Sequence, residues 1–540
     1  MATQALAQTK QGGGAISDAT PLHARITPSL RLIITLTVMI CSVMEVLDTS
    51  IVNVALPDMM GNLGATLDQI GWVSTGYIVA NVILLPLTGW LSDYFGRKRY
   101  LFYSVTLFTV ASFFCGSSHG LMELILWRVL QGAGGAAFLS ISQSTLMEIF
   151  PPEKRTVAQA IFGVGVIAAP TFGPTVGGIL TSRLSWPWIF YINLPIGIIC
   201  GALILLYLPD SQVAGAKRSA DLWGILFLAI GLGSLQAVLE RGESEDWFEA
   251  PYIVALSVLS VIGIGLFIWW QKSARNQFPA VNLDVLKNRN LWAGTVCAFA
   301  LGFGLYGSVF VFPQFMQNVQ SHTAEQTGVM LIPSGIMAML MMPIVGRLGG
   351  KIDLRLFIAV GMAVFASSGL AFALRLTTTA SDEMVLLPLL LRGVGLGLQF
   401  VPLSLVALGT LKPQEISSGA GLYNLFRQLG GSFSIAILAT ILDRRQHTHI
   451  THLYERMSLY NPVMQDRLAT LQHAMIEKGL SANDAKIAAM KTLVGSAVKQ
   501  SYVLAFNDVF LIMAVVSVAG ILLIALVEKA KPRQAAGGAH

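Results

Sequence analysis

Long runs of apolar residues follow one another along most of this chain, and short polar stretches separate them. Each run is about 20 residues long and continuous, whereas the tilted strands of a membrane barrel alternate apolar and polar positions. A helix also satisfies its own backbone hydrogen bonds, as the bilayer core requires. The pattern therefore predicts an all-α polytopic membrane protein with about fourteen transmembrane helices. Their expected ranges are 30–56, 70–91, 100–120, 121–150, 157–182, 188–208, 222–240, 252–271, 291–318, 326–346, 356–376, 384–411, 418–442 and 502–527.

The composition of the chain agrees with a membrane protein. Of its 540 residues, 54% are hydrophobic and only 12% are charged, which is too little polar surface to cover a soluble globule of this size. The four cysteines all fall inside apolar runs, and this placement argues against a disulfide framework and against a clustered metal site. We therefore expect no metal centre.

The distribution of basic residues predicts the orientation of the helices. If the N-terminus is cytoplasmic, most lysines and arginines fall in inner loops and tails, and the short outer loops receive only Arg183, Arg241 and Arg375. Such an excess of positive charge on one side is typical of cytoplasmic loops. Both termini are therefore expected in the cytoplasm. The net charge of +6 then follows from topology, so no nucleic-acid partner is expected.

Two acidic residues lie inside the first apolar run. Glu45 and Asp48 are three residues apart and therefore share a helical face. A carboxylate at mid-bilayer costs about 2.5 to 3.5 kcal/mol, so each needs a functional reason or a partner. Arg128 in the fourth run, with Gln131 on the same helical face, needs an acid nearby, and we expect it to pair with either Glu45 or Asp48. This pair either takes part in transport or is a fixed ion pair that only specifies helix packing.

Two further arginines lie in later apolar runs. Arg392 is followed by glycines and by Gln399, which echoes the glycines and glutamine after Arg128 and hints at an internal repeat. Arg427 precedes another glycine pair. For both arginines, a structural and a substrate-facing role are open alternatives at this point.

Sequence motifs around these residues carry a resemblance to a known family. The segment from Gly89 to Arg99 resembles the G-x-L-x-D-x-x-G-R-K-x signature of the major facilitator superfamily, and residues 128–132 resemble its second arginine motif. Residues 47–57 and 173–178 resemble the first-helix and antiporter motifs of the fourteen-helix drug:proton antiporters in that superfamily. The chain is thus similar to inner-membrane components of tripartite multidrug efflux pumps over nearly its whole length.

The resemblance implies a domain organisation. It divides the chain into a disordered cytoplasmic tail at 1–29, a six-helix bundle at 30–208, inserted helices seven and eight with their linkers at 209–290, a second six-helix bundle at 291–527 and a cytoplasmic tail at 528–540. The second bundle includes a periplasmic segment at 444–500. In that segment, the residues after Ser481 predict an amphipathic helix that this serine caps.

The resemblance also implies a function. It predicts proton-driven export of hydrophobic toxicants across the inner membrane of a Gram-negative bacterium, with no cofactor besides the proton gradient. Delivery would go to an EmrA-type periplasmic adaptor and a TolC-type outer-membrane channel. The alternatives are a stand-alone exporter of a lipid-like or cationic substrate and a non-transporting membrane receptor. An enzyme is not expected, because His447, His449 and His452 do not share one helical face and do not suit a zinc site.

Roles for individual residues follow from the charges and the motifs together. Asp48, Glu45 and Arg128 are the candidates for proton coupling, and an acid at position 45, where similar proteins can carry an uncharged residue, would change proton stoichiometry or admit cations. The candidates for conformational change are Gly89, Asp93, Gly96, Arg97, Gly173, Pro174, Gly177 and Gly178. The candidates for substrate binding are Gln131, Phe303, Tyr306, Phe310, Gln399, Phe400 and Arg427.

Overall fold

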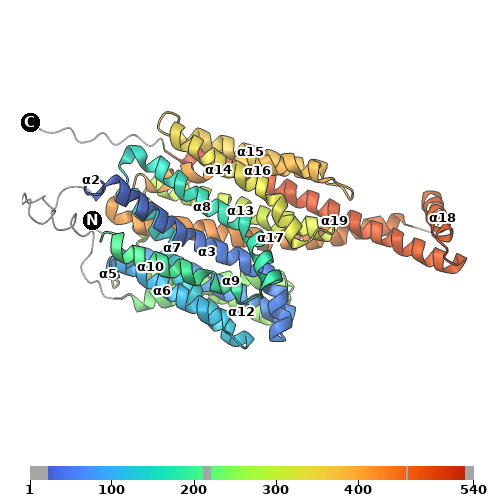
Figure 1. Cartoon of the computed structure of the whole chain (residues 1–540), viewed down its shortest axis with the longest axis horizontal. Coiled ribbons are helices and arrows are strands. Elements are labelled where there is room, and N and C mark those ends of the chain that lie inside the picture. The colour runs from blue at the N-terminus through green and yellow to red at the C-terminus, as the bar shows by residue number, and fades with distance from the viewer. Residues whose placement is uncertain (1–21, 211–219, 458–459, 529–540) are drawn as a thin grey trace, which may run out of the picture.

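The protein is a bundle of helices packed side by side, as a computed structural model of the chain shows (Figure 1). The structure describes residues 22–210, 220–457 and 460–528. Thirteen helices in this part of the chain are long and apolar enough to cross a membrane. The remaining expected run forms α6 (Arg97–Gly116), which begins with three basic residues and packs against α7 and α10. The predicted all-α polytopic class is confirmed.

Twelve of the helices fall into two sets of six with the same packing. The first set is α3 (Pro28–Leu63), α4 (Leu67–Leu84), α6, α7 (Leu121–Ile149), α8 (Arg155–Arg183) and α10 (Asn193–Tyr207). The second set is α13 (Arg289–Asn318), α14 (Ala324–Leu348), α15 (Leu354–Arg375), α16 (Asp382–Leu408), α17 (Ile416–Arg456) and α19 (Ala482–Leu523). In the first set α3 packs on α8, α4 on α7 and α6 on α7, and the second set repeats this as α13 on α17, α14 on α16 and α15 on α16. Arg128 on α7 and Arg392 on α16 therefore occupy corresponding places.

The two sets meet along a few helices. Helix α8 packs against α14 and α16, while α17 packs against α7 and against the segment that follows α4. That segment is broken, because Pro86 lacks a backbone N–H: the expected helix at 70–91 divides into α4, a 3₁₀ turn η1 (Leu85–Leu87) and α5 (Thr88–Phe95). Both η1 and α5 contact α17.

Two additional helices lie beside this pair of bundles. Helix α11 (Leu222–Arg241) packs against α4 of the first set and α17 of the second, and α12 (Pro251–Gln271) packs against α11. These are the expected inserted helices seven and eight. The domain boundaries at 209 and 290 stay a prediction.

Beyond the bundle, α17 and α19 continue into the expected outer segment. They are 41 and 42 residues long, so each extends for about 60 Å, roughly twice the thickness of a bilayer core. The short helix α18 (Pro462–Glu477) packs against α19 at the far end of the molecule (Figure 1). Ser481 caps α19 as predicted, with its Oγ accepting a bond from the Asp484 N–H at 3.2 Å. The sequence suggested that the capped amphipathic helix and the last membrane span are separate elements. In the structure they form one continuous helix, α19.

The predicted disordered tails lie largely outside the described residues, which exclude 1–21 and 529–540. Within the described part, residues 22–29 hold the short helix α2 (Leu22–Arg25) and the first residues of α3. Thr27 and Pro28 are start signals for α3, since Thr27 accepts a bond from the Leu30 N–H and proline suits the first helical turn. The expected disorder therefore does not extend over these eight residues.

Candidate transport site

Asp48 lies at the centre of a buried polar cluster within the first set of helices. Its carboxylate accepts bonds from Arg128 Nη1 at 2.6 Å, Gln131 Nε2 at 2.9 Å and Asn193 Nδ2 at 3.0 Å. Ser112 of α6 accepts further bonds from Gln131 and Asn193 at 3.1 Å. We call these five residues the Asp48 cluster. It contains the expected ion pair between Asp48 and Arg128, and it ties α3, α6, α7 and α10 together.

The guanidinium of Arg128 is held on every side. Its Nη1 also donates to Gln131 Oε1 at 2.7 Å, and its Nε donates to the Val73 carbonyl at 3.2 Å. The Tyr77 ring covers it at 4.2 Å from the ring centroid. Both charged side chains are almost fully buried. A buried ion pair that is this completely bonded resists separation, because either partner alone would be left uncompensated.

Glu45 belongs to a second cluster at the boundary between the two sets. Its Oε1 accepts a bond from Asn81 Nδ2 at 3.1 Å. Tyr77, Asn81 and Glu45 all face Gly135 of α7. Arg427 of α17 and Tyr306 of α13 act on Glu45 electrostatically from the second set. We call Glu45, Tyr77, Asn81, Tyr306 and Arg427 the interface cluster.

The interface cluster is bonded far less completely than the Asp48 cluster. Within the described residues, no hydrogen-bond partner is found for Glu45 Oε2, the Tyr77 hydroxyl or Nε and Nη1 of Arg427, although all are buried. Leaving a buried polar group unpaired costs about 1 to 3 kcal/mol, and more for a charged one. Such groups are suited to exchange partners during a conformational change or to bind polar groups of a ligand.

The predicted substrate residues divide between several places. Phe400 lies under the Arg427 guanidinium at 5.6 Å and beside Gly163 of α8, so it joins the interface cluster. Phe303 and Phe310 lie on α13 three residues before and four after Tyr306, on the same helical face. Gln131 is in the Asp48 cluster, and Gln399 packs against Gly361 of α15. The structure therefore brings together Tyr306, Phe400 and Arg427 but not the two glutamines.

Arg392 lacks the acidic partner that Arg128 has. Its Nε and Nη1 donate to the hydroxyls of Ser308 at 2.8 Å and Ser334 at 2.9 Å. No carboxylate among the described residues forms an ion pair with it. A cavity of about 10 Å³ lies beside it, between α8, α13, α14 and α16. The repeat that the sequence suggested is thus present in position but not in charge pairing.

The Gly89 to Arg99 segment is mostly helical, although the expected helices at 70–91 and 100–120 leave residues 92–99 between them. Residues 89–95 belong to α5 and α6 begins at Arg97, so Gly96 makes the connection alone, with φ +80° that favours glycine. Arg97 pairs with Glu148 of α7 and also lies within electrostatic range of Asp93. A Cβ on Gly89 would lie 2.7 Å from Ser418 Cα, so α5 and α17 are in close contact.

The glycines of the antiporter motif form a packing surface on α8. A Cβ on Gly173 would lie 2.7 Å from Ser50 Cβ, and one on Gly177 would lie 3.2 Å from the Ile51 carbonyl oxygen. Gly178 faces open space. Helix α8 remains one element although Pro170 and Pro174 lie inside it. These glycines thus let α8 approach α3 closely.

Several members of both clusters are uncharged and were not singled out from the sequence. Asn81 of α4 donates to Glu45 and Asn193 of α10 donates to Asp48, while Ser112 of α6 bonds to Asn193 and Tyr77 of α4 lies beside Glu45 at Gly135. The available signal was an amide inside an apolar run, because burying an amide without a partner is costly. The charges predicted the acids and arginines, whereas these uncharged side chains carry no comparable signal in the sequence.

The chain matches known transporters over most of its length. Residues 38–435 match the family described as the Major Facilitator Superfamily. The chain is 34% identical over 484 residues to the multidrug export protein EmrB of Haemophilus influenzae, which covers 89% of this chain and 93% of that one. It is 32% identical over 511 residues to the fatty acid resistance protein FarB of Neisseria gonorrhoeae, covering 94% and 97%.

A solved structure shares the fold. The proton:xylose symporter XylE, bound to 6-bromo-6-deoxy-D-glucose, aligns with a TM-score of 0.56 at 13% identity, covering 91% of this chain and 95% of that one. The two helix sets, their interface and the family match agree with one another. The chain belongs to the major facilitator superfamily, in its group of multidrug export proteins, and is a multi-pass inner-membrane transporter rather than an enzyme.

Proposed function

We propose that this chain is a proton-driven efflux transporter that exports hydrophobic toxicants by alternating access between its two helix sets. The observation that carries the proposal is the interface cluster. It places an acid of the first set and an arginine of the second in a buried site with several unpaired polar atoms. No cofactor is needed, because the proton gradient drives the cycle. Moving one charge across the membrane contributes about 2.3 kcal/mol per 100 mV.

The described conformation suggests how the cycle proceeds. The contact between Gly89 and Ser418 closes the predicted cytoplasmic ends of the two sets. A proton that reaches Glu45 from outside removes its attraction to Arg427 and so favours separation of the sets at the cytoplasmic end. A drug that binds beside Tyr306 and Phe400 favours loss of the proton. Drug and proton therefore compete at one site.

Asp48 and Glu45 have different tasks in this scheme. Asp48 forms an ion pair with Arg128 inside one helix set, and this pair keeps α3 packed against α7. Glu45 faces the moving interface with one oxygen unpaired. The bonding thus favours Glu45 over Asp48 as the residue that takes up the transported proton, with Arg128 in a supporting role.

The test is Glu45→Gln compared with Asp48→Asn in proteoliposomes. A glutamine at position 45 can still accept the bond from Asn81, so Glu45→Gln should fold and bind drug, but drug should no longer move protons. Asp48→Asn, if it folds, should retain coupling. Drug flux and an internal pH indicator are read together. Normal proton movement in Glu45→Gln would overturn the assignment.

The substrate class is proposed from the site and from the relatives. Aromatic side chains at the interface suit apolar molecules, and similar proteins bear names for multidrug export and fatty acid resistance. The acid at position 45 also allows recognition of cations. If Glu45→Gln weakens export of cationic dyes but not of hydrophobic weak acids, Glu45 reads substrate charge. Equal loss for both classes supports coupling instead.

We further propose that the outer hairpin of α17, α18 and α19 docks an EmrA-type periplasmic adaptor that leads to a TolC-type channel. The support is its reach, since α18 lies at the far end of two helices that leave the bundle (Figure 1). Replacing residues 462–477 with a flexible linker should abolish whole-cell resistance but spare transport in vesicles. Retained resistance would indicate a stand-alone exporter, and loss of both activities would indicate a covering flap over the exit.

A further inference from the structure

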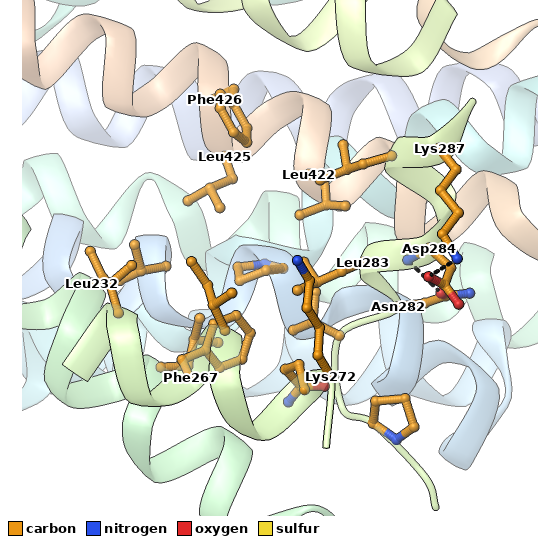
Figure 2. A pocket seen from close by; sticks show the side chains of 18 residues that line it. Leu232, Phe267, Lys272, Asn282, Leu283, Asp284, Lys287, Leu422, Leu425 and Phe426 are labelled. Atoms are coloured by element: carbon orange, nitrogen blue, oxygen red, sulfur yellow. Dashed lines mark hydrogen bonds and ion pairs between the residues drawn. The ribbon is translucent and has the colours of Figure 1, made fainter. Parts of the chain in front are cut away.

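A cavity of about 800 Å³ lies outside both polar clusters, beside the inserted helices. It is partly open and lies between α11, α12, the segment 279–287 and α17, whose lining side chains are drawn in Figure 2. Its volume is within the range of known small-molecule sites. The lining residues include Leu228, Leu232, Phe267, Leu422, Leu425 and Phe426. Most of the wall is therefore apolar.

Basic groups stand against this apolar wall. Lys272 follows the end of α12, and its side chain extends into the cavity between Phe267 and Leu283 (Figure 2). Among the described residues, no carboxylate forms an ion pair with its ammonium. Lys287 lies at the other side and pairs with Asp284 at 2.8 Å. Two cations and one anion leave a net positive charge, which complements an anionic group.

The cavity lies at the end of the bundle where Gly89 contacts Ser418. Pro86 of η1 contributes to its wall, and η1 packs against α17 just before the contact of Gly89 with Ser418. Leu425 and Phe426 directly precede Arg427 of the interface cluster. Basic residues of this end are those expected in the cytoplasm, so the cavity lies at the level of the cytoplasmic leaflet.

We propose that this cavity binds one anionic phospholipid of the cytoplasmic leaflet. An acyl chain lies against Leu232, Phe267 and Leu425, and the phosphate is bound near Lys272. Burial of the chain supplies affinity in proportion to the apolar area covered, and the unpaired lysine selects an anionic headgroup. The occupant joins α11 and α12 to α17, so it favours the conformation in which the cytoplasmic ends are closed.

The test measures lipid binding to the purified full-length protein by native mass spectrometry. Delipidated protein is titrated with phosphatidylglycerol and, in parallel, with phosphatidylcholine. In wild type, the first phosphatidylglycerol should bind more tightly than further phosphatidylglycerol molecules do. It should also bind more tightly than the first phosphatidylcholine. Lys272→Gln should weaken this first binding step about fivefold, the effect of one lysine near a lipid headgroup. Lys272 and Lys351 are both exposed, but Lys351 lies outside the cavity, so Lys351→Gln should not change this binding step.

A second variant tests the apolar part of the cavity. Leu232→Trp fills the space that an acyl chain would use and should abolish the first binding step for phosphatidylglycerol, whether or not Lys272 is present. If Leu232→Trp does not fold, the comparison of Lys272→Gln with Lys351→Gln tests the proposal on its own. Equal binding of phosphatidylglycerol by Lys272→Gln and Lys351→Gln would overturn the proposal. So would equal affinity of wild type for the two lipids.

Discussion

At the scale of single residues, Arg128 and Arg392 occupy corresponding places in the two helix sets, but their guanidinium groups have different kinds of hydrogen-bond partner. Arg128 faces Asp48 at 2.6 Å, whereas the partners of Arg392 within the described part of the chain are the hydroxyls of Ser308 and Ser334. Removing one partner of a buried ion pair leaves the other charge uncompensated, whereas removing a buried cation that has no counter-ion leaves no opposite charge behind. The two arginines should therefore respond differently to the same substitution.

Arg128→Met should destabilise the protein by about 3 to 5 kcal/mol, because Asp48 would remain buried without its cation. Arg392→Met should cost about 1 kcal/mol or less, because the two serine hydroxyls it leaves are neutral. Thermal unfolding of the purified variants measures both. The double variant Asp48→Asn with Arg128→Met should regain part of the loss. If Arg128→Met and Arg392→Met lowered the melting temperature equally, the difference in charge pairing would have no effect on stability.

At the scale of elements, the packing of α8 on α3 depends on which glycine faces the neighbour. A Cβ at position 173 would lie 2.7 Å from Ser50 Cβ, whereas one at 178 meets nothing within 4 Å. Gly173→Ala should cost about 1 to 3 kcal/mol through overpacking and should slow transport. Gly178→Ala should be neutral or slightly stabilising, because alanine favours a helix by about 0.5 to 1 kcal/mol. Drug efflux and melting temperature of the two variants give the comparison, and equal effects would refute it.

The Asp221 carboxylate, at the start of α11, links α11 to α12 and to the segment that follows α12. It accepts bonds from the Gly224 N–H at 2.9 Å, Trp270 Nε1 at 2.7 Å, Asn276 Nδ2 at 2.8 Å and the Ala280 N–H at 3.2 Å. Burial raises the pKa of this carboxyl, but the bonds from Trp270, Gly224, Asn276 and Ala280 outweigh it and hold the pKa below its usual range. Its ionised form therefore stabilises the hairpin.

The lowered pKa of Asp221 predicts how the stability that this carboxylate contributes depends on pH. A folded-state pKa below the unfolded value of about 3.9 means that the stabilisation is complete above that value and is lost as the pH falls through the folded pKa. Asp221→Asn should therefore cost about 1 to 3 kcal/mol at neutral pH. Its melting temperature should approach that of wild type as the pH is lowered below about 4. A constant difference down to the lowest pH would contradict the assignment.

At the scale of the whole molecule, the apolar pattern was enough to predict the fold class, because a helix in a bilayer needs only length and hydrophobicity. The charged residues in the apolar runs also predicted that Arg128 pairs with an acid of the first helix, since a buried arginine can hardly lose its proton and must be compensated, but they left Glu45 and Asp48 both open. The sequence could not predict that Glu45 faces Arg427, because they are 382 residues apart and nothing local specifies which helices of the two sets meet. Pro86 interrupts its helix whereas Pro170 and Pro174 lie inside an unbroken α8, so the sequence alone did not show which proline breaks a helix. The length of the outer helices likewise does not follow from hydropathy.

The contact of Gly89 with Ser418 gives a direct test of motion between the two helix sets. A Cβ at position 89 would lie 2.9 Å from Ser418 Cβ, slightly closer than the 3.5 to 4.5 Å that a disulfide prefers. In the double variant Gly89→Cys with Ser418→Cys, oxidation should therefore join α5 to α17 after a small adjustment. Because the four native cysteines are buried, they should not compete.

If the cytoplasmic ends must separate in every cycle, oxidation of this double variant should stop drug transport in proteoliposomes, and a reductant should restore it. The comparison uses the same protein in two redox states, so any slowing caused by the substitutions themselves cancels. Wild type treated with oxidant should be unaffected. Full transport by a quantitatively cross-linked protein would show that these ends stay together throughout the cycle, and alternating access between the two sets would then be wrong.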